Sequence, residues 1–136
     1  MKTELFYLLC SALLAGCLWI PVVIGYVLAR GLPTPADYRS APTSPLPDWV
    51  NRANRAHLNA VESFAPFAAV VLAASAMGLS NAVTQACAAT FFYARVAHAG
   101  IHLSGFGHFK ARTVVFTVAW LAFVILAAEV LRSAAR

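Results

Sequence analysis

Three long stretches without any charged side chain limit what this chain can fold into more than any other feature. They are residues 5–29, 63–94 and 113–128. An α-helix needs roughly 20 apolar residues to cross the hydrocarbon core of a bilayer. Hydrophobic residues make up 61% of the chain and charged residues 11%, whereas soluble domains carry about 25% charge. The sequence therefore predicts an integral membrane protein with a single domain.

The second stretch is too long for one span, and Gly78-Leu79-Ser80-Asn81 interrupts it. This composition is typical of a tight turn between helices, and Ser80 or Asn81 can cap the helix that follows. We therefore predict an all-α fold, a four-helix transmembrane bundle. Its helices are expected at about residues 4–30, 48–78, 81–104 and 109–132. Asp48 is expected to cap the second helix.

The first helix contains Leu14-Ala15-Gly16-Cys17, which looks like the cleavage box of a bacterial lipoprotein. A mature lipoprotein normally turns polar after that cysteine, but here the apolar run continues to Ala29. We therefore keep residues 4–30 as an uncleaved helix that is long enough to span. Pro21 is tolerated within it, because neighbouring helices can satisfy the carbonyl that the proline leaves free.

The proline-rich segment 31–47 is predicted to be an extended connector rather than a domain. Four spans place the two termini and the turn near Ser80 on one side, and this connector on the other. Most of the basic side chains belong to the connector's side: Arg30, Arg39, Arg52, Arg55, Lys110 and Arg112. The positive-inside rule then predicts a cytoplasmic connector with both termini on the opposite side. Anionic lipid headgroups or an anionic cytosolic ligand suit this charge, and the pattern is not that of a nucleic-acid binder.

The second predicted helix carries a polar stripe at its entry to the membrane. At about 100° per residue, Arg52, Arg55, Asn59 and Glu62 fall within an arc of roughly 80°. A solvated helix start explains Arg52, but a membrane-embedded charge such as Glu62 costs about 2.5–3.5 kcal/mol. Charges kept at that cost usually face a cavity and have partners. Pro66 adds to the polarity, because it has no N–H to donate to the Glu62 carbonyl.

The third predicted helix supplies candidate partners. Arg95, His98 and His102 share one face, within about 60°. A histidine pair at this spacing can bind a metal ion, but no acidic or thiol ligand accompanies it, so no metal site is predicted. Together with the basic start of the fourth helix, the two stripes predict a pocket for a small polyanion that also bears an ammonium group.

The stretch RAHLNAVESFAPF resembles the helix 2 signature of the MAPEG family, the membrane-associated proteins of eicosanoid and glutathione metabolism. That signature is Arg-Ala-His-x-Asn-x-x-Glu followed by Pro-Phe. The stretch ARVAHAGIH is similar to the family's Arg-x-x-His-x-x-x-Tyr, and Arg112-Thr113 matches the start of helix 4. The resemblance covers the whole chain, which is similar to the microsomal glutathione transferases and to uncharacterised proteobacterial members.

The resemblance implies a homotrimer of left-handed four-helix bundles in the bacterial inner membrane. Glutathione, the co-substrate, would bind between neighbouring subunits from the cytosolic side, and a hydrophobic small molecule would enter from the membrane lipids. Position by position, the resemblance assigns glutathione binding to six residues: Arg30, Arg55, Asn59, Glu62, Arg95 and His98. It assigns catalysis to Arg112, as the stabiliser of the thiolate, and to His102, which stands where the family has tyrosine.

Two readings of the function follow, and a small transporter or metal-binding protein is a third. In the first, guanidinium groups lower the pKa of the glutathione thiol, and the thiolate attacks a lipophilic electrophile in a transferase or peroxidase reaction. In the second, the chain shares the fold but binds lipid or another small anion without catalysis. His102 and Phe116 replace two tyrosines of the family's eicosanoid-forming enzymes, which argues against prostaglandin or leukotriene synthesis.

Overall fold

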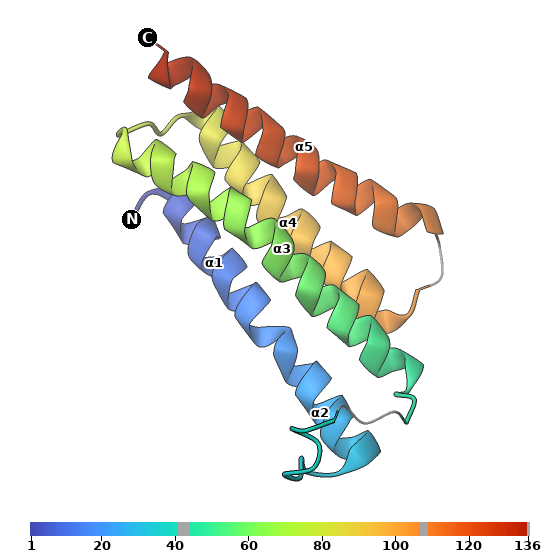
Figure 1. Ribbon diagram of the computed structural model, residues 1–136. Coiled ribbons are helices and arrows are strands. Elements are labelled where there is room, and N and C mark those ends of the chain that lie inside the picture. Colours follow the sequence, from blue (N-terminus) through green and yellow to red (C-terminus); the bar gives the residue numbers. More distant parts are fainter. Residues whose placement is uncertain (41–43, 107–108, 136) are drawn as a thin grey trace.

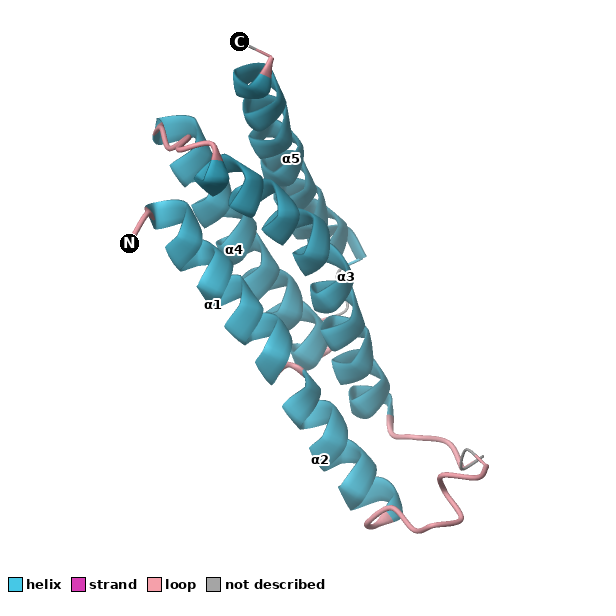
Figure 2. Ribbon diagram, turned by 60° about the vertical axis from the view of Figure 1, so that its left-hand side comes forward, coloured by secondary structure: helices cyan, strands magenta, loops and turns pink. Residues whose placement is uncertain are grey.

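The computed structural model describes residues 1–40, 44–106 and 109–135, and these fold into a bundle of α-helices (Figure 1). The helices are α1 (Thr3–Cys17), α2 (Trp19–Arg30), α3 (Asp48–Ala76), α4 (Ala82–Ser104) and α5 (Phe109–Ala134). No strand occurs in the described ranges. Figure 2 shows α1 and α2 following one another end to end along one rod, and α3, α4 and α5 complete the bundle. The all-α prediction is confirmed.

The two ends of the bundle differ in what they contain. Figure 1 shows both termini and the α3–α4 turn at one end, which we call the termini end. The start of α3, the last turns of α2 and α4, and the segment between α2 and α3 lie at the other, which we call the loop end. The proline-rich connector therefore belongs to the loop end, although residues 41–43 within it lie outside the described ranges.

The first predicted helix is divided in the structure, because α1 and α2 meet at Leu18. The backbone there is still right-handed, with φ −67° and ψ −14°. Pro21 lacks the N–H that would bond to the carbonyl of Cys17, four residues back. The missing bond explains why the helix breaks one turn before the proline rather than at it.

Three helical stretches are long and apolar enough to cross a membrane: Thr3–Arg30, Asp48–Ala76 and Lys110–Ala134. The chain is therefore an integral membrane protein by its length and composition. Helix α4 has 23 residues, about 35 Å at 1.5 Å per residue, and it packs against α1, α3 and α5. A fourth span through α4 stays a prediction.

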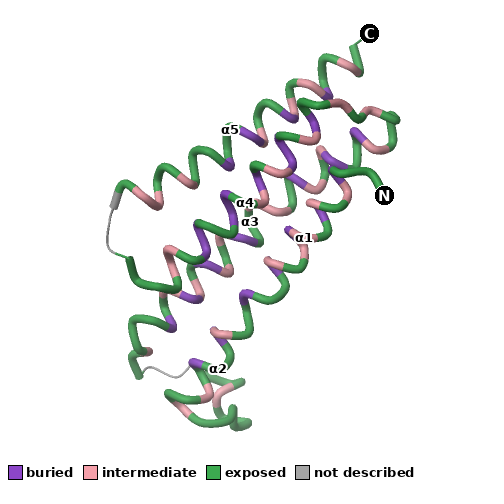
Figure 3. The backbone as a smooth tube through the Cα atoms, turned by 180° about the vertical axis from the view of Figure 1, so that it is seen from behind, coloured by how far each residue is buried: buried purple, intermediate pink, exposed green. Residues whose placement is uncertain are grey.

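The core of the bundle contains a stacked aromatic pair where α3 and α4 meet. The rings of Phe67 and Phe91 stack with their centroids 3.8 Å apart and their planes 9° apart. Phe67 is fully buried, and so is Leu126 of α5. A second cluster, nearer the loop end, consists mainly of small residues, Ala15, Ala60 and Ala99 among them. Small side chains let the helix backbones approach closely, as is usual in membrane bundles. Figure 3 shows the buried positions on the inward faces of the helices.

Helix α2 approaches α3 through Gly25. A Cβ atom at this position would lie 2.5 Å from Cγ2 of Val50, so no larger residue fits without moving the two helices apart. Val50 itself is fully buried. This contact fixes the start of α3 beside the end of α2. The residue that precedes α3 is Pro47, and Asp48 makes no capping hydrogen bond, so the cap expected from Asp48 is not what the structure has.

The α3–α4 turn follows the prediction closely. Gly78 has φ 70°, a left-handed conformation that favours glycine. The Asn81 side chain accepts hydrogen bonds from the backbone N–H groups of Val83, at 2.9 Å, and Thr84, at 3.0 Å. The Thr84 hydroxyl accepts one from the N–H of Asn81, at 2.9 Å. This reciprocal pair is a capping box, and Asn81 is confirmed as the cap.

Polar groups gather around this cap, with Glu4 and Thr84 buried among them, and sequence analysis did not predict them. The Glu4 carboxylate is 3% exposed and accepts hydrogen bonds from the hydroxyls of Thr84 and Ser80. Glu129 of α5 accepts one from the Asn81 side chain, at 2.9 Å, and pairs with Arg132 at 2.8 Å. We call this set the termini-end network: Glu4, Ser80, Asn81, Thr84, Glu129 and Arg132. It joins α1, α4 and α5 where their ends meet.

Candidate functional site

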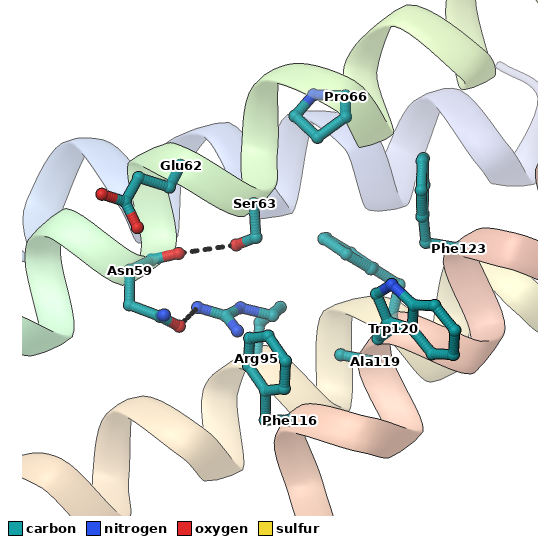
Figure 4. A pocket seen from close by; sticks show the side chains of 10 residues that line it. Asn59, Glu62, Ser63, Pro66, Arg95, Phe116, Ala119, Trp120 and Phe123 are labelled. Atoms are coloured by element: carbon teal, nitrogen blue, oxygen red, sulfur yellow. Dashed lines mark hydrogen bonds between the residues drawn. The ribbon is translucent and has the colours of Figure 1, made fainter. Parts of the chain in front are cut away.

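A pocket of about 320 Å³ opens between α3, α4 and α5. Figure 4 shows its side chains seen from close by. Helix α3 contributes Asn59, Glu62, Ser63 and Pro66, α4 contributes Phe91 and Arg95, and α5 contributes Phe116, Ala119, Trp120 and Phe123. Three of the residues singled out from the sequence (Asn59, Glu62 and Arg95) are thus brought to one cavity by two different helices.

The polar wall of the pocket is built on one hydrogen bond between α3 and α4. The Arg95 guanidinium donates from Nη2 to Oδ1 of Asn59 across 2.6 Å, as Figure 4 shows. Arg95 is 4% exposed, and its buried Nε has no hydrogen-bond partner among the described residues. A buried cation with spare donors is costly unless something accepts from it. The wall therefore has capacity for an acidic or carbonyl group.

Glu62 lies on the same wall but is not paired. Its side chain is exposed, and the structure gives it no hydrogen bond or ion pair with any described residue. One turn further along α3, Pro66 has no N–H to offer the Glu62 carbonyl. The hydroxyl of Ser63 instead turns back to its own helix and donates to the Asn59 carbonyl at 2.8 Å. The α3 wall therefore presents acceptors to an incoming ammonium group.

The opposite wall is aromatic. It consists of Phe91 from α4 and of Phe116, Trp120 and Phe123 from α5. Trp120 is 52% exposed, so the pocket opens toward the outer face of α5. That face carries other large apolar side chains, as a lipid-facing surface does. The arrangement can hold a charged molecule on the α3 side and an apolar one beside it.

The histidines of α4 lie next to this pocket, toward the loop end. The rings of His98 and His102 meet edge to face with centroids 4.7 Å apart, and His98 lies 6.1 Å from the Phe116 ring. Arg112 and Arg95 lie close enough to both histidines for their positive charges to interact with the imidazole rings. The charge of Arg55 also acts on His102.

The structure therefore gathers most of the predicted site from three helices. We call this set the loop-half group: Arg55, Asn59, Glu62, Arg95, His98, His102 and Arg112. Basic side chains outnumber acidic ones in it, and within the described ranges Glu62 is its one carboxylate. The described residues contain no group of three or more histidine, cysteine or acidic side chains that could hold a metal ion.

Arg30 and Arg52, both singled out from the sequence, lie outside this pocket. Arg30 lines a separate cavity between α2 and the connector, where its Nη2 donates to the Ser44 carbonyl. Arg52, the first residue of the polar stripe, covers the end of α4. Its guanidinium would lie 3.1 Å from a Cβ atom at Gly105, the left-handed residue that ends the helix. The polar stripe of α3 thus serves two places rather than one.

Sequence reasoning missed the aromatic wall. Phe116, Trp120 and Phe123 follow one another at intervals of four and three residues, which places them on one face of α5. In an apolar span this spacing does not stand out from ordinary core or lipid-facing residues. Side-chain size is the signal that could have found them. The three large rings lie on one face of a helix whose other residues are mainly aliphatic.

The fold and the pocket define a class of protein: an integral membrane helix bundle with a charged cavity beside an apolar face. The sequence model of the MAPEG family matches residues 6–132, nearly the whole chain, and the chain belongs to the MAPEG family. Members of this family generally use glutathione. No curated protein sequence matches the chain.

Proposed function

We propose that the protein is a glutathione-dependent transferase that acts on lipophilic electrophiles. The observation that carries the proposal is the pocket between α3, α4 and α5, with an unpaired Glu62 carboxylate, a buried Arg95 cation and an aromatic wall. Family membership supports a membrane function related to glutathione or eicosanoids at the level of the family. The residues of the pocket then suggest how such a function would work.

Glutathione carries one ammonium group, two carboxylates and a thiol, and the loop-half group offers a partner for each kind of charge. Glu62 suits the ammonium group. Arg55 and Arg95 suit the carboxylates, because a guanidinium can contact a carboxylate with two parallel hydrogen bonds. Asn59 orients Arg95 through their 2.6 Å hydrogen bond. His98 lies 6.1 Å from the Phe116 ring of α5 and is close enough to Arg95 to interact with its charge.

The chemistry requires an ionised thiol. Nearby guanidinium charge lowers the pKa of a thiol, and Arg112 would supply that charge, with His102 beside it. The thiol proton leaves to solvent, and the thiolate sulfur forms a bond to the electrophilic carbon. The electron pair of the bond that breaks goes to the leaving group or to an acceptor atom of the substrate. The aromatic wall would hold the apolar part of that substrate.

The assembly we propose is a homotrimer in the bacterial inner membrane, with four spans in each subunit and the connector in the cytoplasm. Two observations support a site shared between subunits. Arg55 and Glu62 are both exposed in a single chain, and Glu62 has no partner among the described residues. A neighbouring subunit would cover them and exclude water from the bound thiol.

The test is glutathione binding to the protein purified in detergent, by calorimetry, with the ultraviolet absorbance of the thiolate as a second readout. We expect saturable binding with thiolate formation. In Glu62→Gln the affinity should fall roughly tenfold or more, the effect of one charge-assisted hydrogen bond. Asp48→Asn, which removes an exposed carboxylate from the start of the same helix, is the matched control and should bind normally. No binding to the unaltered protein would refute the proposal.

A second candidate function is binding of lipid or another small anion without turnover. It is favoured because the pocket lacks a free hydroxyl that could donate a hydrogen bond to a thiolate. Ser63 is the one hydroxyl among the ten lining residues, and it donates to its own helix. Arg112→Ala separates the two candidates. A transferase should lose turnover and thiolate absorbance but keep much of its glutathione binding. A protein that only binds would show no turnover with any of a panel of electrophiles.

A further inference from the structure

A second cavity, of about 710 Å³, lies between α2 and the connector. Its volume is within the range of about 300–1,000 Å³ that is usual for small-molecule sites. One wall is apolar and belongs to the membrane-spanning stretch, with Val22, Val23, Tyr26 and Val27 among its residues. The other wall comes from the connector, outside that stretch. The cavity therefore straddles the boundary between hydrocarbon and water.

Two opposite charges line this cavity without pairing with each other. Arg30 is close enough to act on the charge of Asp37, but no ion pair joins them within the described ranges. The Nε of Arg30 is buried and has no hydrogen-bond partner there. The Asp37 carboxylate accepts from the N–H and the hydroxyl of Thr34, both at 2.7 Å, and these bonds hold its pKa below the ordinary value. Asp37 is thus a carboxylate at neutral pH.

We propose that this cavity binds a zwitterionic phospholipid from the surrounding bilayer, with its phosphate on Arg30, its ammonium group toward Asp37 and an acyl chain along α2. An amphiphile fits the position, because its headgroup and tail lie on the two sides of the same boundary. A zwitterion fits the charges, because the phosphate and the ammonium group bridge two side chains that do not reach each other.

The headgroup is ethanolamine rather than choline. Asp37 offers hydrogen-bond acceptors, which a primary ammonium group can use and a quaternary one cannot. Recognition of a quaternary ammonium normally uses a cage of aromatic rings. Tyr26 is the one aromatic residue among those lining the cavity, and Arg30 already lies over its ring, 5.4 Å from the centroid.

The experiment is native mass spectrometry of the detergent-purified protein, titrated in parallel with dioleoyl phosphatidylethanolamine, phosphatidylcholine and phosphatidylglycerol. We expect the ethanolamine lipid to bind roughly tenfold more tightly than the choline lipid, which lacks the charge-assisted hydrogen bond to Asp37. Arg30→Gln should weaken binding of all three lipids. Asp37→Asn should keep lipid binding but abolish the preference for ethanolamine.

Arg39→Gln is the matched control, because Arg39 is an exposed connector residue that does not line the cavity. Equal loss in Arg39→Gln and Arg30→Gln would overturn the proposal in favour of general surface charge, and so would equal affinity for the three lipids. Arg30→Lys keeps the charge with fewer donors and should weaken binding less than Arg30→Gln does. It decides the matter if Arg30→Gln fails to fold.

Adding glutathione to the lipid-bound protein separates this inference from the proposed function. The lipid should stay bound while glutathione occupies the other pocket. Displacement of the lipid by glutathione would assign Arg30 to the glutathione site and overturn the lipid site. Lipid binding in a protein that does not bind glutathione would leave this inference standing and refute the proposed function.

Discussion

The termini-end network and the loop-half group are both clusters of polar side chains in an apolar bundle, but they differ in pairing. In the network, both carboxylates accept hydrogen bonds from neighbouring helices or from Arg132. In the loop-half group, Glu62 has no partner among the described residues, and buried nitrogens of Arg95 and His102 lack acceptors. A polar group buried without a partner destabilises a fold, so the unpaired nitrogens of Arg95 and His102 fit the proposal that this cluster binds a ligand or a neighbouring subunit.

The comparison distinguishes side chains that stabilise the bundle from side chains that are proposed to bind a ligand. The network joins residues of α1, α4 and α5 that are distant in sequence, and its members bond with one another within one chain. Among the described residues, the loop-half group makes one interhelical hydrogen bond, between Asn59 and Arg95. Substitutions in the network should therefore act on stability, and most substitutions in the loop-half group should act on binding.

The largest expected effect tests the exception to that division. Asn59→Leu removes the acceptor of a buried guanidinium and should lower the free energy of unfolding by about 3 kcal/mol. Asn54→Leu, a control on the same helix at a half-buried position with no recorded hydrogen bond, should change it by less than about 1 kcal/mol. Denaturant titration in detergent measures both. Equal effects would mean that Arg95 finds another acceptor in the assembled protein.

Next in size is the loss of the Thr84 hydroxyl from the network. Thr84→Val keeps the shape of a fully buried side chain but removes the hydrogen bond to the Glu4 carboxylate and the acceptor of the Asn81 N–H. We expect a loss of about 1–2 kcal/mol, the upper part of the range for interhelical hydrogen bonds in membranes. Thr90→Val, at an exposed position of the same helix, is the control. A neutral Thr84→Val would show that the network does not stabilise the bundle.

The cap of α4 should contribute somewhat less. Asn81→Ala removes the capping oxygen and should cost about 1 kcal/mol. Asn81→Ser restores a capping oxygen but not the bond to Glu129, so the difference between the alanine and serine variants gives the contribution of the cap, and the difference between serine and the original asparagine gives that of the Glu129 bond. Thermal unfolding followed by circular dichroism suffices. If serine restores nothing, the cap is unimportant and the Glu129 contact carries the effect.

A still smaller effect on stability is expected from Glu62→Gln. Because its carboxylate has no partner within the described chain, the free energy of unfolding without ligand should stay within about 0.5 kcal/mol of the original. The same variant is expected to lose glutathione affinity. A loss of stability above about 1 kcal/mol would contradict the comparison, since it would show that Glu62 is already paired in the assembled protein.

The smallest effect concerns Asp37, a carboxylate at the loop end that accepts hydrogen bonds from Thr34. Its bonds to Thr34 lower its pKa below the ordinary value of 3.8. A depressed pKa means that the contact contributes above pH 3.8 and is lost as the pH falls below that value. The nuclear magnetic resonance chemical shift of the Thr34 amide should therefore change with pH only in acid. The global unfolding midpoint should not change with pH near neutrality. A change near pH 6 would refute this assignment.

Much of the fold was predictable because its signals are local. The Gly78 turn and the Asn81 cap lie within four residues of each other, and the apolar runs set the helix lengths. The network was not predictable in this way, because Glu4 and Thr84 are 80 residues apart. Glu4 and Glu129 also lie just outside the uncharged runs, so they read as solvated helix ends. The argument applied to Glu62, that an embedded carboxylate needs a reason, would have singled them out as well.

The candidate site was likewise predictable only where its signals are local in sequence. Helical periodicity placed Asn59, Glu62 and Arg95 on inward faces, and the structure brings these three to one pocket. Periodicity has no information on which helices are neighbours, so it does not show that Arg30, at the end of α2, lines a different cavity within one chain. Its contact with glutathione stays a prediction. Nor could it place Arg52 over Gly105, because that contact depends on where α4 ends in space.

The break at Leu18 has a consequence for the match between protein and bilayer thickness. The rod formed by α1 and α2 has 28 residues, about 42 Å of helix against a hydrocarbon core of about 30 Å. Excess length is absorbed by tilting or kinking. Because the Gly25–Val50 contact holds the end of α2 beside the start of α3, we expect the break at Leu18 to absorb excess length while α1 keeps its contacts in the termini-end network. A membrane with longer or shorter acyl chains is therefore expected to change the angle at Leu18 before it disturbs the packing of α2 against α3.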